Sequence, residues 1–171
     1  MFKRILVPVD FSDRSLEALD RAVDFGRDYA AALVVLHVVE PVYLPGSADA
    51  FGGGYDSRLV YEELEHSARE RLMQLAADLA RRRVPARPLL RAGTPHQVIV
   101  DVARRLKADL IMMSTHGRTG LSHLAMGSVA ERVVRTATCP VMTLRAAPPP
   151  PTRRRQGRVT RRRAPRRAAV R

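Results

Sequence analysis

The chain has 171 residues, enough for one domain of ordinary size with an appendage but not for two full domains. No stretch approaches the roughly 18 apolar residues of a membrane-spanning helix, and with Cys139 as the single cysteine an internal disulfide and a cysteine-based metal cluster are excluded. The net charge is +13, but residues 146–171 hold ten arginines and no acid. The nearly balanced remainder argues against a domain whose whole surface tracks nucleic acid.

The first elements combine one buried strand, one helix and a second strand. Residues 3–10 form a continuous apolar run, typical of a strand buried on both faces of a parallel sheet. The run turns polar at Asp10, too early for a signal peptide, so we expect a cytoplasmic protein. Ser12 is placed to cap a helix, and residues 32–39, rich in valine and leucine, predict the second strand.

A loop, a long helix and a third strand follow. Residues 40–57 hold two prolines and three consecutive glycines, the composition of a loop. Apolar residues then recur every three or four positions and predict a long helix whose stripe belongs to the core: Leu64, Ala68, Leu72, Leu75 and Leu79. Residues 86–92 predict the third strand, and Thr-Pro-His-Gln at 94–97 predicts a capping box that opens the third helix.

The last elements complete an alternating pattern of strands and helices. Residues 108–114 predict a fourth buried strand, residues 130–137 a fourth helix and residues 141–144 a fifth strand. Because parallel strands need crossover connections, the pattern indicates an α/β fold: an open five-stranded parallel sheet with helices on both faces. Ligands of such sheets bind beyond the carboxyl ends of the strands, which directs attention to Asp10 and to the loop beginning at Ser114.

The segment from Ser114 to Ser128 is suited to binding phosphate. It leaves a buried strand, contains Gly117 and Gly120, and reaches Gly127-Ser128 at the start of a helix. Glycines let backbone amides approach an anion, the helix amino terminus adds partial positive charge, and Ser128 adds a hydroxyl donor. Neither a P-loop nor a dinucleotide-binding glycine string occurs in the chain. The alternative is that this segment only connects a strand to a helix.

The same residues resemble the universal stress protein family. Ser114-Thr115-His116-Gly117 is followed, after nine residues, by Gly127-Ser128, and residues 5–12 and 36–39 look like the first two strands of that family. The resemblance covers residues 2–145 and implies a Rossmann-like fold of the adenine nucleotide alpha hydrolase type, with strand order 3-2-1-4-5. We therefore expect a domain of residues 1–145, followed by a disordered, basic Pro/Arg-rich tail of residues 146–171.

The resemblance also implies an ATP site. Gly117, Gly127 and Ser128 would hold the phosphates, Asp10 would approach the ribose or a divalent ion, and Val38 would meet the adenine. Because a carboxylate repels phosphates, we expect Mg²⁺ to accompany the nucleotide, with Asp10 as its candidate ligand. The candidate site as a whole consists of Pro8, Val9, Asp10, Val38, Ser114, His116, Gly117, Arg118, Gly127, Ser128 and Val129.

Asp10 and His37 also have simpler explanations, and Ser114 departs from the family pattern. Asp10 is equally well explained, from the residues alone, as a helix-capping aspartate. His37 is typical of a hydrogen-bonded core histidine rather than a ligand. Ser114 stands where the nucleotide-binding branch of the family has its first glycine, and serine adopts most glycine conformations except those with positive φ.

We expect a universal stress protein acting as an ATP-binding regulator of the stress response. No nucleophile with a base and no paired carboxylates emerge, so at most slow ATP hydrolysis is expected. The alternative that Ser114 favours is a dimeric interaction protein of the same fold without nucleotide binding. A further alternative is a nucleic-acid-associated factor that acts through the tail.

Two surfaces predict partners other than the nucleotide. The strand Val141–Leu144 ends the fold, and as an edge strand it would pair with its symmetry mate in a homodimer, as is common in the family. The ten tail arginines would bind nucleic acid or an anionic surface with little sequence preference. The alternative for the tail is a solvated extension without a partner.

Overall fold

The computed structural model describes residues 2–41, 57–115 and 126–145. Its elements in chain order are β1 (Arg4–Pro8), α1 (Asp13–Tyr29), β2 (Ala32–Val39), α2 (Ser57–Arg81), β3 (Ala86–Ala92), α3 (Pro95–Leu106), β4 (Leu110–Ser114), α4 (Ser128–Thr136) and β5 (Val141–Leu144). The predicted alternation is confirmed, although β1 and β4 are shorter than the apolar runs that contain them. Across the described ranges, every helix is too short or too polar to cross a membrane.

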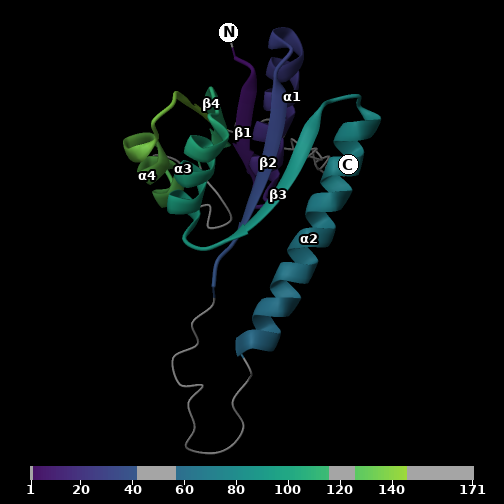
Figure 1. Cartoon of the computed structure of the whole chain (residues 1–171), viewed down its shortest axis with the longest axis vertical. Helices are drawn as coiled ribbons and strands as arrows, with labels where there is room; N and C mark the ends of the chain where they lie inside the picture. Colours follow the sequence, from purple (N-terminus) through teal and green to yellow (C-terminus); the bar gives the residue numbers. More distant parts are fainter. Residues whose placement is uncertain (1, 42–56, 116–125, 146–171) are drawn as a thin grey trace, which may run out of the picture.

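The five strands form one parallel sheet in the order β3-β2-β1-β4-β5, as expected. From β1 the chain first builds outward through β2 to β3 and then returns to the other side of β1 for β4 (Figure 1). The order of the strands therefore reverses between β1 and β4. In open α/β sheets this reversal marks the crevice in which ligands bind.

Helices cover both faces of the sheet, and alternate strand residues feed two separate cores. In β1, Ile5 and Val7 pack with α1 and α2, whereas Leu6 packs with α3 and α4. In β4, Met112 belongs to the core with α1 and α2, and Ile111 belongs to the core with α3 and α4. Since both faces of β1, β2 and β4 are buried, these three strands are nearly continuous apolar runs rather than alternating ones.

Helix α1 begins and ends as local chemistry dictates. The Ser12 side chain accepts a hydrogen bond from the Ser15 amide, which confirms the predicted cap, and Asp13 adds negative charge to the first turn. The helix ends at Ala30, whose φ of 53° and ψ of 38° lie in the left-handed region. Helix α3 begins where expected, at Thr94-Pro95, but the Thr94 side chain makes no capping hydrogen bond, so that part of the predicted capping box is wrong.

Helix α2 is long, and only part of its predicted apolar stripe is core. Ala68, Leu72 and Leu79 are buried, whereas Leu64 is 43% exposed. The prediction that the whole stripe is core is therefore wrong at its first residue. The start of α2 lies near the carboxyl ends of β2 and β3, at the more open end of the sheet (Figure 1).

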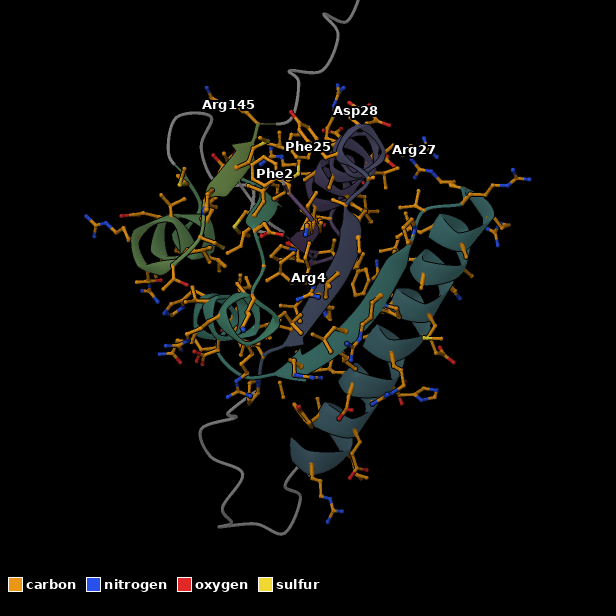
Figure 2. The ribbon with its side chains drawn as sticks, turned by 45° about the horizontal axis from the view of Figure 1, so that its top comes forward. Phe2, Arg4, Phe25, Arg27, Asp28 and Arg145 are labelled. Atoms are coloured by element: carbon orange, nitrogen blue, oxygen red, sulfur yellow. The ribbon has the colours of Figure 1, made fainter. Side chains whose placement is uncertain are left out.

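Aromatic rings close the amino-terminal end of the sheet. Phe2, just before β1, lies 5.5 Å from Phe25 and 5.7 Å from Tyr29 between ring centroids, and Phe25 and Tyr29 stack at 4.4 Å. Figure 2 shows Phe2 and Phe25 next to each other. This end of the sheet is filled by side chains, in contrast to the carboxyl ends of the strands.

Candidate nucleotide-binding cleft

A cleft of about 630 Å³ opens beyond the carboxyl ends of β1, β2 and β4. Every predicted site residue that the structure describes lines it: Pro8, Val9, Asp10, Val38, Ser114, Gly127, Ser128 and Val129. These residues come from three strand ends and the start of α4, and only the sheet topology brings them together. His116, Gly117 and Arg118 lie outside the described residues.

Asp10 serves the local backbone as well as the cleft. Its Oδ1 accepts hydrogen bonds from the Ser12 amide at 3.0 Å and the Ser12 hydroxyl at 2.6 Å. Ser12 in turn caps α1. Asp10 is therefore not the capping residue of α1 but a hydrogen-bond partner of that residue, and its carboxylate also lines the cavity.

The amino terminus of α4 forms one wall of the cleft. Gly127 is the N-cap residue, and its amide donates to the Thr115 carbonyl at 2.7 Å. Its φ of −62° and ψ of 147° are accessible to any L-residue. Glycine is thus not needed here for backbone conformation, and what it provides is the absence of a Cβ at the cleft wall.

Ser114 ends β4 beside the cleft. The positive-φ residues in the described ranges other than glycine are Phe11, Ala30, Arg83 and Lys107. Ser114 is therefore not in the left-handed conformation that only glycine adopts readily. The backbone at this position tolerates serine, whatever the role of the glycine that the family pattern has there.

His37 and Phe11 form the floor of the cleft on the side of α2. His37 is buried, and its Nδ1 lies 2.7 Å from the Val9 carbonyl oxygen; because a carbonyl only accepts, Nδ1 carries the proton. The ring centroids of His37 and Phe11 are 4.3 Å apart. The expectation of a hydrogen-bonded core histidine is confirmed, and the structure adds that His37 lines the cleft.

Arg71 of α2 was missed by the sequence reasoning. Its Cζ lies 4.4 Å from the centroid of the Phe11 ring, over the ring. With Leu64, Ser67 and Ala68 it presents one helical face to the cleft, at spacings of three and four residues. Arg71 follows Ala68 by three residues, so it lies on the same face of the helix. Its partner ring, Phe11, is 60 positions away in sequence and gives no local signal.

Charged groups of both signs line the cleft. Arg71 and Arg132 are the arginines among its described lining residues, and Asp10 and Glu40 are the acids. Helix α3 contributes Thr94, Pro95 and His96 from its first turn. Within residues 2–41, 57–115 and 126–145, no three His, Cys, Asp or Glu side chains lie close enough together to form a metal site. A divalent ion held by Asp10 would therefore need ligands other than these side chains.

The comparisons with known proteins are consistent with this geometry. The model of the universal stress protein family matches residues 1–145. The universal stress protein MJ0531 of Methanocaldococcus jannaschii is 34% identical over 148 residues, which cover 85% of this chain and 83% of that protein.

Two solved structures share the fold. Universal stress protein UspA from Lactobacillus plantarum is 27% identical and superposes with a TM-score of 0.73, covering 84% of this chain and 98% of its own. A universal stress protein family protein from Arabidopsis thaliana, solved with AMP bound, is 20% identical with a TM-score of 0.60, covering 84% and 91%. The latter likeness shows the fold alone.

Proposed function

The chain belongs to the universal stress protein family, and we propose that its cleft binds ATP with Mg²⁺ and that the protein is a nucleotide-responsive regulator of the stress response. The observation that carries the proposal is that all eight described residues of the predicted site line one cleft. That cleft lies where α/β sheets bind ligands, at the reversal of strand order. A plant protein with the same fold has been solved with AMP.

Each part of the nucleotide has a counterpart in the proposal. The amides at the start of α4, with Gly127 and Ser128, take phosphate oxygens, since a helix amino terminus carries partial positive charge. Val38 takes the adenine, and Asp10 takes the ribose or the metal ion. Gly117 would complete the phosphate loop from outside the described residues.

A single carboxylate suits magnesium that arrives with a nucleotide. Mg²⁺ keeps several waters and is held by one or two carboxylates plus substrate phosphates rather than by a full protein cage. Asp10 is such a carboxylate, and the two hydrogen bonds from Ser12 to its Oδ1 fix its orientation. The ion would offset the repulsion between Asp10 and the phosphates.

The proposal is tested at Gly127. Because its backbone angles suit alanine, Gly127→Ala should fold normally, while the added Cβ obstructs the approach of phosphate. We expect ATP affinity in the presence of Mg²⁺ to fall about tenfold or more by calorimetry, the equivalent of about 1.4 kcal/mol. Thr136→Ala, at the opposite end of α4, is the control and should bind as the parent does.

Two results would refute the proposal. One is the absence of saturable binding when the parent is titrated with ATP and Mg²⁺. The other is a Gly127→Ala variant that binds ATP as tightly as the parent. Denaturing freshly purified protein and identifying any released nucleotide gives an independent check.

A homodimer through β5 is part of the proposal. β5 lies at the edge of the sheet, and all four of its residues are partly exposed. The Pro140 and Leu144 carbonyls accept from β4, so by alternation the Thr143 amide points away from β4. Thr143→Pro should therefore convert a dimer to a monomer without loosening β4, and a parent that is monomeric at micromolar concentration by light scattering would count against the dimer.

The tail remains a prediction, because residues 146–171 lie outside the described residues. Its ten arginines favour binding to nucleic acid or an anionic surface. Deletion of residues 146–171 should abolish retention of the protein on DNA at low salt. Unchanged retention would show that the tail is not responsible.

A further inference from the structure

Arg71 differs from the other arginines of its helix. Arg58 pairs with Glu62 at 2.9 Å and Arg69 pairs with Glu65 at 2.7 Å, each one turn away, and Arg81 pairs with Asp78. The neighbours of Arg71 at three and four residues are Ser67, Ala68, Gln74 and Leu75, none of them acidic. In the described part of the chain, Arg71 makes no ion pair.

Helix α4 repeats this arrangement on the other side of the cleft. Arg135, which is not among the described residues that line the cleft, has its Nε 3.8 Å from Oε1 of Glu131. Arg132 lines the cleft, and its neighbours at three and four residues are Ser128, Val129, Arg135 and Thr136. In both helices the arginines that do not line the cleft pair with an acid, whereas those that line it have none among the described residues.

The two cleft arginines belong to opposite walls. α2 packs on one face of the sheet through Leu72 and Leu79, and α4 packs on the other face through Ala130 and Val133. An anion in the cleft would therefore meet positive charge from both sides. Asp10 and Glu40 also line the cleft and act in the opposite sense, so the arginines and a bound metal ion must together outweigh them.

Phe11 holds the Arg71 guanidinium in an orientation suited to phosphate. The Phe11 ring contacts both groups: its centroid lies 4.3 Å from the His37 ring centroid and 4.4 Å from Cζ of Arg71. A guanidinium over a ring uses its flat face and keeps the N–H donors around its edge for an anion. Phe11 itself has a φ of 61°, a strained conformation for a phenylalanine and one that tends to occur at functional sites.

We infer that Arg71, positioned by Phe11, is a phosphate-binding residue of the cleft, and that with Arg132 it makes the cleft favour nucleotides with two or three phosphates over the monophosphate. The inference rests on the proposed function for the identity of the ligand. The α4 amino terminus and Arg132 hold one end of the phosphate chain. Arg71 donates two hydrogen bonds to the phosphate chain from α2. A single phosphate bound at α4 would not extend far enough to accept them.

Calorimetric titration of the full chain with ATP, ADP and AMP at fixed Mg²⁺ tests the inference. Arg71→Gln should weaken ATP about tenfold, as expected for loss of a charge-assisted hydrogen bond at an exposed site, and should weaken AMP by less than about threefold. Arg69→Gln makes the same charge change two residues away, outside the cleft, and should alter neither by more than about twofold.

Two further variants separate positioning from charge. Arg71→Lys keeps the charge but loses the planar fork, so its ATP affinity should lie between those of the parent and Arg71→Gln. Phe11→Leu keeps the apolar volume but removes the aromatic face. It should weaken ATP only while Arg71 is present, so that the two substitutions are not additive.

The outcomes distinguish the inference from the proposed function. If Arg71→Gln lowers the affinities for ATP, AMP and adenosine equally, Arg71 contacts the base. If the ATP affinity is unchanged, Arg71 does not contact the nucleotide. Either result overturns the inference while ATP binding stands. Inorganic triphosphate, which has no base, is the second probe. If the parent binds it through Arg71 but binds ATP no better, the nucleotide proposal fails and the phosphate site stands; if the parent binds neither, both fail.

Discussion

Replacing Gly93 by alanine perturbs the connection that leads from β3 into the cleft. Gly93 has a φ of +132°, a region that residues with a Cβ rarely adopt. Its amide donates to the Val39 carbonyl at 3.0 Å, and the next two residues, Thr94 and Pro95, line the cleft. An alanine must either accept this strained backbone or shift the start of α3.

The size of the effect follows from two terms. A residue forced into such a sparsely populated conformation costs about 1–3 kcal/mol. The new Cβ would also lie 2.9 Å from Cγ2 of Val98, and overpacking of this kind costs about 1–3 kcal/mol where neighbours give way only partly. We expect Gly93→Ala to lower the free energy of unfolding by about 2–6 kcal/mol, which for a domain of this size lowers Tm by about 4–24 °C.

Urea unfolding followed by circular dichroism measures this loss, and a second substitution divides it. Val98→Ala removes the methyl group that the new Cβ would meet but leaves φ unchanged. In a double-mutant cycle, the loss from Gly93→Ala should be smaller by about 1 kcal/mol when Val98 is already alanine. A fully additive cycle would assign the whole effect to the backbone.

A Gly93→Ala variant within about 0.5 kcal/mol of the parent would refute the reasoning, because surface substitutions without a specific mechanism fall in that range. It would mean that the connection relaxes without strain. The same variant should also bind ATP less well than its stability predicts, if displaced Thr94 and Pro95 alter the cleft wall.

Three further predictions concern other parts of the fold. Ala30→Gly, at the left-handed end of α1, should stabilise the protein by about 0.5–1 kcal/mol in the same urea assay; a loss of stability would contradict the assigned conformation. The Lys3 and Arg4 amides each donate to Asp109 Oδ2 at 2.8 Å and lower the pKa of that carboxyl below its usual range. This contribution to stability is present above the unfolded pKa and is lost as pH falls through the folded one, so Asp109→Ala should be less stable at pH 7 and should decline less between pH 7 and about pH 2; parallel pH profiles would show that the two amides do not matter. Burial raises the pKa of the Cys139 thiol, so a disulfide reagent should modify it more slowly in native than in urea-unfolded protein at pH 7.5, and equal rates would place it in free solvent.

Much of the fold could be predicted because strands buried on both faces leave a plain signal. The apolar run at residues 32–39 coincides with β2, and the strand predicted at residues 86–92 coincides with β3, although only Leu89 is buried there. The run at residues 3–10 extends beyond β1, since Val9 is still buried and its amide donates to the Leu36 carbonyl after the ladder has ended at Pro8. Apolar content measures burial, and burial continues past the last paired residue.

The cleft could be predicted only where the sequence carries a local pattern. Asp10 follows β1, Ser114 ends β4 and Gly127 caps α4, and parallel strands bring such positions to one edge of the sheet. The contact between Arg71 and Phe11 has no local signal, because it depends on how α2 packs across the sheet. The same is true of Leu64, whose exposure depends on how far the sheet extends beneath its helix.

The junction between β1 and β4 is short. Its register joins Ile5 to Leu110 and Leu6 to Ile111, whereas β2 and β3 are joined over seven positions. Asp10 and Val38 stand on one side of this junction, and Ser114 and Gly127 on the other. A molecule that contacts all four residues would bridge the sheet at its shortest strand pairing. Its binding should therefore slow amide exchange in β1 and β4 together, and the ligand would change the rigidity of the fold without changing its shape.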